Sequence, residues 1–402
     1  MSHKLINHSP DLKRLRDEGY TLEIRSGFLL VKDVPYLNSR RVIQRGTLVS
    51  ELTLAGDVTT RPGTHVAYLI GEYPCHKDGR AIERIKNQSY RQTLAAGLVI
   101  DHTFSAKPPS GFYENFYTKL TTYVNILSGP ARAIDPTVTA QVFAPIESVE
   151  EKETVFNYID VASSRAEIGS ATEKLALGKI AIVGLGGTGS YVLDLVAKTP
   201  VKEIHLFDHD TFLQHNAFRA PGAPSIEELK AKPLKVVYFK NLYSKMRRGI
   251  VAHDTFIDEE NVEQLRRIDF AFLCLDQGTV KRLIVKKLEE FGISFIDVGM
   301  GVYLSEASLG GTLRITTSTP QQRYLARARL PFSDGNEQNE YARNIQIADL
   351  NALNATLAVI KWKKLYGFYL DYTPDYQSTY TIELQLLAKE VGSHETGKTS
   401  QP

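Results

Sequence analysis

The sequence predicts an α/β fold with a mostly parallel sheet, preceded by a smaller α+β domain. Two observations predict this class. From about residue 160 onward, short apolar runs typical of strands alternate with stretches of helical periodicity, and such alternation produces a parallel sheet with helices on its faces. Residues 1–150 instead show several extended runs followed by one helical segment, so we place a domain boundary near 150–160.

The first domain, expected over 1–150, begins with strands. Between about 20 and 70, TLEIRSGFLLVKDV, RRVIQRGTLVSELTL and HVAYLIGEYP are apolar runs broken by Asn, Gly or Pro, as in short strands. Apolar residues then recur at helical spacing, which predicts a helix over about 111–127. These residues are Phe112, Phe116, Leu120, Tyr123 and Val124.

The second domain is expected over 155–390, and a disordered tail over 391–402. Its expected elements are, in order, a strand at 179–184, a helix at 189–198, a strand at 203–207, a helix at 233–246, a strand at 268–275, a helix at 279–291 and a strand at 293–298. Two strand-like segments, GGTLRITTSTP and TYTIELQLLAKEV, flank a long helix from about 346 to 366.

The segment that joins the first two of these strands indicates a nucleotide site. An apolar run from Ile180 to Val183 meets a glycine-rich turn, and a second run from Ile204 to Phe207 leads to Asp208. Glycines let the backbone approach phosphate oxygens, and the next helix offers free N–H groups to them. We therefore predict a nucleotide-binding βαβ unit in which Asp208 holds a ribose hydroxyl. The turn glycines are Gly184, Gly186, Gly187 and Gly189.

The residues that follow Asp208 favour ATP over NAD. One loop supplies a second acid, an amide and an arginine, namely Asp210, Asn216 and Arg219. Arg219 can pair with phosphate in a bidentate manner, and Asn216 can donate to phosphate or accept from ribose. An NAD site needs none of the three. An NAD-dependent oxidoreductase remains an alternative, because the glycine spacing alone also satisfies the dinucleotide fingerprint.

Two residues further along the chain extend the predicted site. Lys235 opens a helical stretch, and a lysine there can neutralise charge while the α-phosphorus is attacked. Asp276 ends the apolar run DFAFLCLD, at the carboxyl end of a strand, where open parallel sheets place their ligands. A carboxylate at that position can hold Mg²⁺ bridging the phosphates.

In order and spacing, these residues resemble the adenylating enzymes of the ThiF/MoeB-like ubiquitin-activating superfamily, over roughly 155–390. The family pattern combines a GxGGxG turn, D-x-D with a following N-x-x-R, a lysine, and an aspartate before an N-x-x-x-R-like stretch. Gln277 replaces the usual Asn of that stretch, and Lys281 replaces its Arg. Arg165 looks like the family's arginine that reaches the phosphates from the partner subunit, which implies a homodimer.

The resemblance implies a Rossmann-like adenylation domain that uses ATP and Mg²⁺. In this family the C-terminal glycine carboxylate of a ubiquitin-like protein attacks the α-phosphate, which yields an acyl-adenylate and pyrophosphate. The N-terminal region, around HTFSAKPPSGFYENFYTKLTTYVNIL, resembles domains fused to activating enzymes in bacterial ubiquitin-like conjugation operons. Such operons also encode a conjugating enzyme, often in an antiphage setting. A second alternative is a nucleotide-binding scaffold, the non-catalytic half of an activating heterodimer.

The nucleophile of a second half-reaction is left open. Ubiquitin activators carry a cysteine in or near the crossover segment, but residues 317–347 contain none. The enzyme either stops at the adenylate, forms an oxyester through a hydroxyl such as Ser333, or uses a cysteine from elsewhere. Cys75 is expected to be exposed beside His76, which can lower its pKa, and Cys274 to lie inert inside a strand. The chain has no CxxC pairs, so no zinc is expected.

Composition argues against several other classes of protein. The 402 residues are 43% apolar and 23% charged, with a net charge of +2, which gives no signal for binding nucleic acid or an anionic membrane. No apolar stretch approaches the ~20 residues that cross a bilayer, and the N-terminus lacks the apolar core of a signal peptide. With only two cysteines, far apart, we expect a cytoplasmic protein without disulfides.

Overall fold

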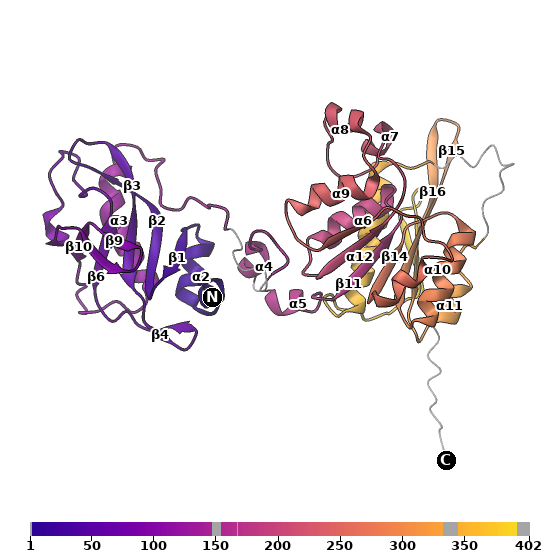
Figure 1. Ribbon diagram of the computed structural model, residues 1–402, viewed down its shortest axis with the longest axis horizontal. Helices are drawn as coiled ribbons and strands as arrows, with labels where there is room; N and C mark the ends of the chain where they lie inside the picture. Colours follow the sequence, from indigo (N-terminus) through magenta and orange to yellow (C-terminus); the bar gives the residue numbers. More distant parts are fainter. Residues whose placement is uncertain (1, 147–153, 167, 333–344, 392–402) are drawn as a thin grey trace, which may run out of the picture. The chain divides into compact units, whose positions relative to one another are not determined.

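The structure, a computed structural model, describes residues 2–146, 154–166, 168–332 and 345–391 (Figure 1). The chain divides into two compact units. One comprises Met1–Ile146 with Ser164–Ala166, and the other Glu147–Ser163 with Glu167–Pro402. Each unit has its own hydrophobic core. The tail expected to be disordered lies outside the described residues, apart from Val391.

The N-terminal unit is built on a six-stranded sheet in the order β1-β2-β3-β6-β10-β7, in which every neighbouring pair is antiparallel. Its strands are β1 (Leu22–Arg25), β2 (Phe28–Leu37), β3 (Ile43–Glu51), β6 (Val66–Ile70), β7 (Lys86–Gln88) and β10 (His102–Ser105). Two small hairpins pair β4 (Leu54–Ala55) with β5 (Val58–Thr59), and β8 (Gln92–Ala95) with β9 (Leu98–Ile100). The helices are α1 (Ser2–His8), α2 (Pro10–Asp17), η1 (Glu83–Ile85) and α3 (Phe116–Arg132).

Helix α3 packs on β2 and β3 and supplies much of this core. It begins later than expected because Asn115 caps it, accepting a hydrogen bond from Thr118 N at 2.8 Å. Phe112 therefore lies before the helix and is exposed, whereas the other four residues of the predicted apolar stripe are buried. The helix also runs past 127, since its Pro130 comes only in the last turn.

The C-terminal unit is built on an eight-stranded sheet in the order β13-β12-β11-β14-β15-β16-β17-β18. The strands from β13 to β15 in this order are parallel, and β16, β17 and β18 are added antiparallel. This confirms the predicted α/β class with a mostly parallel sheet. The strands are β11 (Lys179–Val183), β12 (Glu203–Phe207), β13 (Ile250–His253), β14 (Phe270–Leu273), β15 (Ser294–Ser305), β16 (Ser308–Ser318), β17 (Gln377–Thr381) and β18 (Leu386–Glu390).

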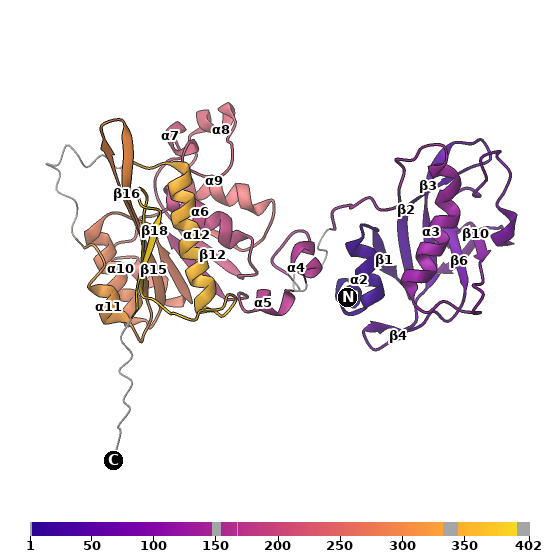
Figure 2. The same ribbon diagram turned by 180° about the vertical axis from the view of Figure 1, so that it is seen from behind.

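Helices cover both faces of this sheet (Figures 1 and 2). Ile180 and Ile182 of β11 share a core with α6, α9 and α12, whereas Ala181 and Val183 share one with η2 and α10. Because β11 is buried on both faces, it appears in the sequence as a continuous apolar run. The helices of the chain after residue 160 are α4 (Val161–Arg165), which the division into two units splits, α5 (Gly169–Glu173), α6 (Gly187–Ala197), α7 (Gln214–Ala217), α8 (Ile226–Ala231), α9 (Lys235–Ser244), η2 (Val262–Arg267), α10 (Gly278–Glu290), α11 (Arg323–Arg327) and α12 (Ala348–Leu365).

Three differences from the expected elements lie in the strands of this sheet. Strand β13 was not predicted, because this short edge strand is mostly half-buried and lacks a clear apolar pattern. The segment TYTIELQLLAKEV contributes to two strands, β17 and β18, joined by a turn in which Gln385 has a φ of +50°. Strand β15 continues past 298 to Ser305 and forms a long hairpin with β16.

Candidate functional site

The glycine turn connects β11 to α6 and lies against the end of β14. Gly184 has a φ of +88°, and a Cβ there would lie 2.5 Å from the carbonyl oxygen of Cys274, so a side chain is excluded. A Cβ at Gly189 would lie 1.9 Å from the carbonyl oxygen of Gly184, so this glycine lets the helix pack on the turn. The N-cap of α6 is Gly186, which supplies no side-chain cap. The N-terminus of α6 therefore has the open character of a phosphate-binding helix.

A cleft of about 580 Å³ opens at the carboxyl ends of the parallel strands. Eight residues predicted for the site line it, although they come from four separate segments of the chain. They are Gly184, Gly186, Gly187, Asp208, Asp210, Arg219, Lys235 and Asp276. Among the residues that the structure describes, the cleft lining includes neither Gly189 nor Asn216 nor Arg165.

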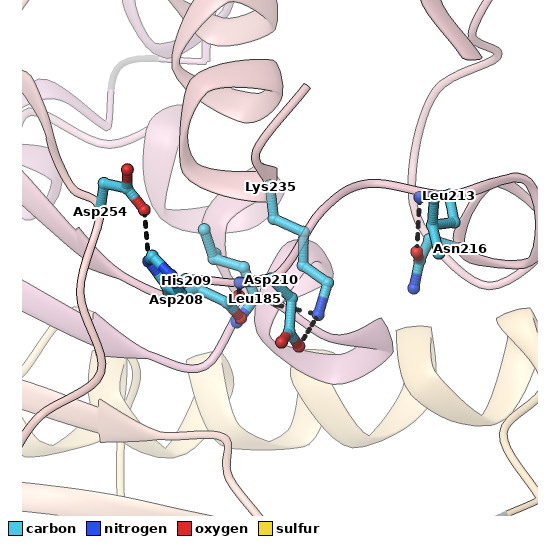
Figure 3. A network of polar contacts seen from close by, with 8 residues as sticks. All are labelled: Leu185, Asp208, His209, Asp210, Leu213, Asn216, Lys235 and Asp254. Carbon is cyan, nitrogen blue, oxygen red and sulfur yellow. Dashed lines mark hydrogen bonds and ion pairs between the residues drawn. The ribbon is translucent and has the colours of Figure 1, made fainter. Parts of the chain in front are cut away.

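Asp208 is held rigidly at the tip of β12. It is 6% exposed, and its two carboxylate oxygens accept hydrogen bonds from Leu185 N at 2.7 Å and Asp210 N at 2.8 Å (Figure 3). One bond reaches the glycine turn and the other its own loop, so the carboxylate is tied to both walls of the cleft. Its remaining lone pairs can accept a ribose hydroxyl.

Lys235, the first residue of α9, is almost fully buried beneath the same loop. Its Nζ lies 2.6 Å from Asp210 Oδ2 and 3.7 Å from Asp208 Oδ1 (Figure 3). A buried cation needs such a partner, and two aspartates around one lysine provide it. Asp210 therefore holds Lys235 at the cleft wall.

Arg219 provides a donor without a partner. Its Nε is buried and has no hydrogen-bond acceptor among the described residues, although the side chain lines the cleft. An unpaired buried guanidinium N–H is costly unless a ligand supplies an acceptor. Together with the uncapped glycine turn, this orphaned donor fits the phosphates of a bound nucleotide.

Asp276 lies exposed at the cleft, three residues after the end of β14 at Leu273. In the described part of the chain, no group of three or more His, Cys, Asp or Glu residues is arranged to hold a metal ion. One carboxylate ligand from the protein suits Mg²⁺ that takes its other oxygens from phosphates and water. Asp276 would hold Mg²⁺ in this way, and the ion would neutralise phosphate charge.

Asn216 has a different position from the one expected of a nucleotide contact. It is buried, and its Oδ1 accepts a hydrogen bond from Leu213 N at 2.8 Å (Figure 3). This contact closes the first turn of α7, in the loop that carries Arg219. The structure thus places Asn216 as a support of that loop.

The remaining predicted residues lie elsewhere. Arg165 is the last residue of α4, is exposed, and belongs to the segment Ser164–Ala166 that groups with the N-terminal unit. Ser333 lies outside the described residues.

The prediction that Cys75 is exposed is wrong. Cys75 is 3% exposed, its Sγ donates to Tyr73 O at 3.4 Å, and burial raises the pKa of the thiol. The neighbouring His76 does not offset this burial. Cys274 lies just beyond β14, not within it, and lines the cleft. Burial also raises the pKa of the Cys274 thiol, so neither cysteine has the low-pKa environment of a nucleophile.

A charged triad that we did not predict lies at the β15–β16 end of the cleft. Lys281 Nζ is 2.8 Å from Asp297 Oδ1, and Arg314 Nη2 is 2.8 Å from Asp297 Oδ2. Asp297 and Lys281 are buried. Burial raises the pKa of the Asp297 carboxyl, and the two cations offset only part of this effect. Even when Asp297 is fully ionised, its charge cancels only one of the two positive charges of Lys281 and Arg314.

Two buried asparagines of α12 also escaped the sequence interpretation. Asn351 Oδ1 accepts a hydrogen bond from Thr188 Oγ1 at 2.9 Å, and Asn354 Nδ2 donates to Gly299 O at 3.2 Å. Asn354 lines the cleft. A signal was present, since asparagines three apart in the mostly apolar LNALNATLAVI fall on one helix face that must be buried.

Helices of the described residues are all too short or too polar to cross a membrane. No protein of a curated collection matches the sequence. The fold is similar to that of E. coli MccB solved with MccA-N7isoASN, with 15% identity, 56% of this chain and 67% of that chain covered, and a TM-score of 0.42. It is also similar to that of PaaA, with 16% identity, 55% of this chain and 75% of that chain covered, and a TM-score of 0.43. A third similar structure is E. coli tRNA N6-threonylcarbamoyladenosine dehydratase, TcdA, with 18% identity, 51% of this chain and 92% of that chain covered, and a TM-score of 0.38.

Two family models match the chain. Residues 10–161 match a domain of unknown function, DUF6791, and residues 161–401 match the ThiF family. The second match covers more than half of the chain and contains the whole cleft, including the glycine turn, Asp208 and Asp276. The chain therefore belongs to the ThiF family of adenylating enzymes, which use ATP.

Proposed function

We propose that this protein adenylates the C-terminal glycine carboxylate of a ubiquitin-like protein, as the activating step of a bacterial ubiquitin-like conjugation pathway. The carboxylate oxygen forms a bond to the α-phosphorus of ATP, the bond to the β-phosphate oxygen breaks, and pyrophosphate leaves. The observation that carries the proposal is the convergence of the glycine turn, Arg219, Lys235 and Asp276 on one cleft.

In this proposal each residue of the nucleotide end has a separate role. Asp208 holds the ribose, and the uncapped N-terminus of α6 receives phosphate oxygens. Arg219 binds phosphate through its unpaired Nε, and Lys235 neutralises charge that develops around the α-phosphorus. Mg²⁺ held at Asp276 would stabilise the leaving pyrophosphate. The catalysis is then mainly positioning and charge neutralisation.

Further parts of the proposal rest on the family resemblance. We propose a homodimer in which Arg165 of one subunit completes the cleft of the other, a conjugating enzyme as the next partner, and antiphage defence as the setting. The product leaves as an adenylate or passes to a nucleophile. The raised pKa values of the Cys75 and Cys274 thiols favour a hydroxyl such as Ser333, or a partner's nucleophile, over a thiol of this chain.

Ligand-induced thermal stabilisation separates ATP binding from the NAD alternative. Because a ligand that binds only the folded state stabilises it by about 2.7 kcal/mol at a hundred times its Kd, ATP with Mg²⁺ should raise the melting temperature by several degrees. NADH should not. The reverse result would favour an oxidoreductase.

Mass spectrometry tests the reaction itself. The protein is incubated with ATP, Mg²⁺ and the small glycine-terminated proteins encoded near its gene. Acyl-adenylate and pyrophosphate are expected with one of them. An adduct that survives thiol reductants and yields to hydroxylamine would be an oxyester, and peptide mapping would then locate it at Ser333 or elsewhere. Absence of any product with every candidate would favour the scaffold alternative.

A further inference from the structure

We propose that the N-terminal unit contains a second reactive centre, in which the hydroxyl of Ser89 becomes acylated while His102 acts as the general base. The substrate is an activated acyl compound, such as an ester with a good leaving group or an acyl-adenylate. This inference goes beyond the proposed adenylation, because the two residues belong to the other unit of the chain and their reaction needs no ATP.

Ser89 and His102 form a hydrogen-bonded pair at the edge of the six-stranded sheet. Ser89 Oγ lies 2.7 Å from His102 Nδ1, which is the distance expected between a nucleophile and its base. Ser89 is exposed, so an acyl compound can reach its hydroxyl, whereas His102 is half-buried. His102 begins β10, and Ser89 directly follows β7, the outermost strand of the sheet.

A bulge in the strand pairing brings the two side chains opposite each other. The register of β10 on β7 shifts between Thr103 and Phe104, which leaves Asn87 as an extra residue in β7. Without this bulge, His102 would face the glutamine before Ser89, because a shift by one residue changes every later pair. Bulges are frequent next to active sites, where they redirect a side chain. The extra residue therefore selects the serine as the partner of the histidine.

Three neighbours orient the imidazole of His102. Its ring contacts the ring of Tyr73 edge-on, with centroids 5.0 Å apart and an interplanar angle of 76°. A hydrogen bond to the backbone of Gly71 and the charge of Asp101 both favour the protonated imidazole. Asp101 Oδ2 in turn accepts a hydrogen bond from Gly71 N at 2.9 Å. These contacts stabilise the imidazolium that forms when His102 takes the proton of Ser89.

Burial keeps His102 neutral before the reaction. It has the largest influence on the pKa of His102 and lowers that pKa from its ordinary value of 6.5, although Asp101 and Gly71 act in the opposite direction. An imidazole that is neutral at pH 7 can accept a proton from a hydroxyl that is hydrogen-bonded to it. A serine without such a base is a weak nucleophile.

The acylation step balances with these two residues and the acyl compound. Ser89 Oγ forms a bond to the carbonyl carbon, and the hydroxyl proton passes to His102 Nδ1. The bond between that carbon and the leaving group breaks, and the leaving group departs with the electron pair and takes the proton from His102. The product is an ester of Ser89, and nothing is oxidised or reduced.

The test treats the full-length protein with p-nitrophenyl acetate in the absence of ATP. We expect a burst of p-nitrophenolate, the kinetic sign of an acyl-enzyme, and peptide mass mapping should locate the acetyl group on Ser89. Ser89→Ala should abolish the burst. His102→Gln, which keeps a polar side chain without a base, should slow it about 100-fold, as expected for loss of general-base catalysis.

A second serine–histidine pair on the same strand provides a matched control. Ser105 Oγ lies 3.0 Å from His65 Nε2, but this serine is half-buried within β10. A reactive hydroxyl has to be accessible to its substrate, so Ser105→Ala should retain the full burst. The acetyl group should still map to Ser89 in this variant.

Three results would overturn the centre. An unchanged burst in His102→Gln would show that Ser89 reacts only as an exposed hydroxyl. Acetylation confined to lysine or tyrosine side chains, or no burst at all, would exclude Ser89 as the nucleophile. If His102→Gln fails to fold, Ser89→Ala and Ser105→Ala still decide, because each removes one hydroxyl from a similar pair. Since the assay contains no ATP, a failure of the proposed adenylation would leave its outcome unchanged.

Discussion

Single residues of the cleft differ in how their charges are paired. Lys235 is held by Asp210 at 2.6 Å, and Lys281 shares Asp297 with Arg314, whereas Arg219 Nε has no partner in the described structure. Paired cations keep a fixed position, and an unpaired buried donor awaits an acceptor. The nucleotide end thus combines a fixed lysine with an arginine whose Nε is open to phosphate.

Asp276→Ala tests the proposed Mg²⁺ ligand. Because Asp276 is exposed, its removal should change the free energy of unfolding by no more than about 0.5 kcal/mol. Pyrophosphate exchange should be abolished, since Mg²⁺ would lose its protein ligand. Glu259→Ala removes another exposed carboxylate, one that is not among the described cleft-lining residues, and should leave exchange intact. Normal exchange in Asp276→Ala would exclude the Mg²⁺ assignment.

Lys119 predicts a pH dependence of stability in the N-terminal unit. This lysine of α3 is fully buried and its Nζ donates a hydrogen bond to Ser50 Oγ at 2.9 Å. Burial lowers its pKa from 10.5 to about 8. Below pH 8 it is protonated in both states and destabilises the fold. Between about pH 8 and 10.5 the unfolded state binds more protons, so stability rises with pH.

Replacement of Lys119 by methionine should remove this dependence. Lys119→Met keeps the side-chain length without the charge, so we expect a gain of about 1–3 kcal/mol in the free energy of unfolding at pH 7. Ser50 keeps a partner, because its Oγ also donates to Glu51 O at 2.9 Å. Urea unfolding between pH 7 and 10 measures the free energy of unfolding of the wild-type protein and of Lys119→Met. An equal rise in stability with pH in the variant would show that another group is responsible.

At the scale of elements, the packing of α6 on α12 decides how the glycine turn is presented. The two helices lie side by side (Figure 2), and Asn351 of α12 reaches Gly187 of the turn so closely that a Cβ there would lie 2.1 Å from Asn351 Nδ2. At Gly186 a Cβ would meet no atom within 4 Å. Of these neighbouring glycines, Gly187 is therefore required by the packing of α12, whereas Gly186 faces open space.

This difference is testable with a matched pair of substitutions. Gly187→Ala should destabilise the protein by about 1–3 kcal/mol through overpacking against Asn351, and Asn351→Ala in the same chain should recover part of the loss. Gly186→Ala should leave the melting temperature unchanged and weaken ATP binding, because the added methyl group occupies the approach of the phosphates. Thermal unfolding and calorimetry with ATP measure the two effects. Equal stability losses in both variants would contradict the distinction.

At the scale of the whole molecule, the proposed homodimer makes a prediction about mixtures. If Arg165 acts on the cleft of the partner subunit, Arg165→Ala should lower turnover without preventing ATP binding. Mixed dimers of Arg165→Ala and Asp276→Ala should then contain one site with both defects and one intact site. After subunit exchange, about one quarter of all sites should be active.

The mixture experiment also identifies the alternative. Pyrophosphate exchange is measured for each variant alone and after co-expression. If Arg165 acts within its own subunit, no site in the mixture contains both Arg165 and Asp276. The rate of pyrophosphate exchange then equals the average of the rates of the two variants. Unchanged kinetics in Arg165→Ala alone would remove the proposed role altogether.

The sequence alone was sufficient for the α/β class, the glycine turn, the order of the main strands and helices, and membership of the ThiF family. It also led to the eight residues that line the nucleotide end of the cleft. These features are local, because a strand, a turn, a helix and the residue at a strand's carboxyl end are specified by neighbours in the chain. The roles of those residues remain predictions.

Only the tertiary structure decided which side chains are buried and what they face. It buried Cys75, directed Asn216 to Leu213, and placed Asn354, Arg314 and Lys281 on the second half of the cleft. The last three come from α12, β16 and α10, which meet only because β15 and β16 extend the sheet beyond β14. Burial and pairing depend on such long-range neighbours, and no local pattern in the sequence specifies them.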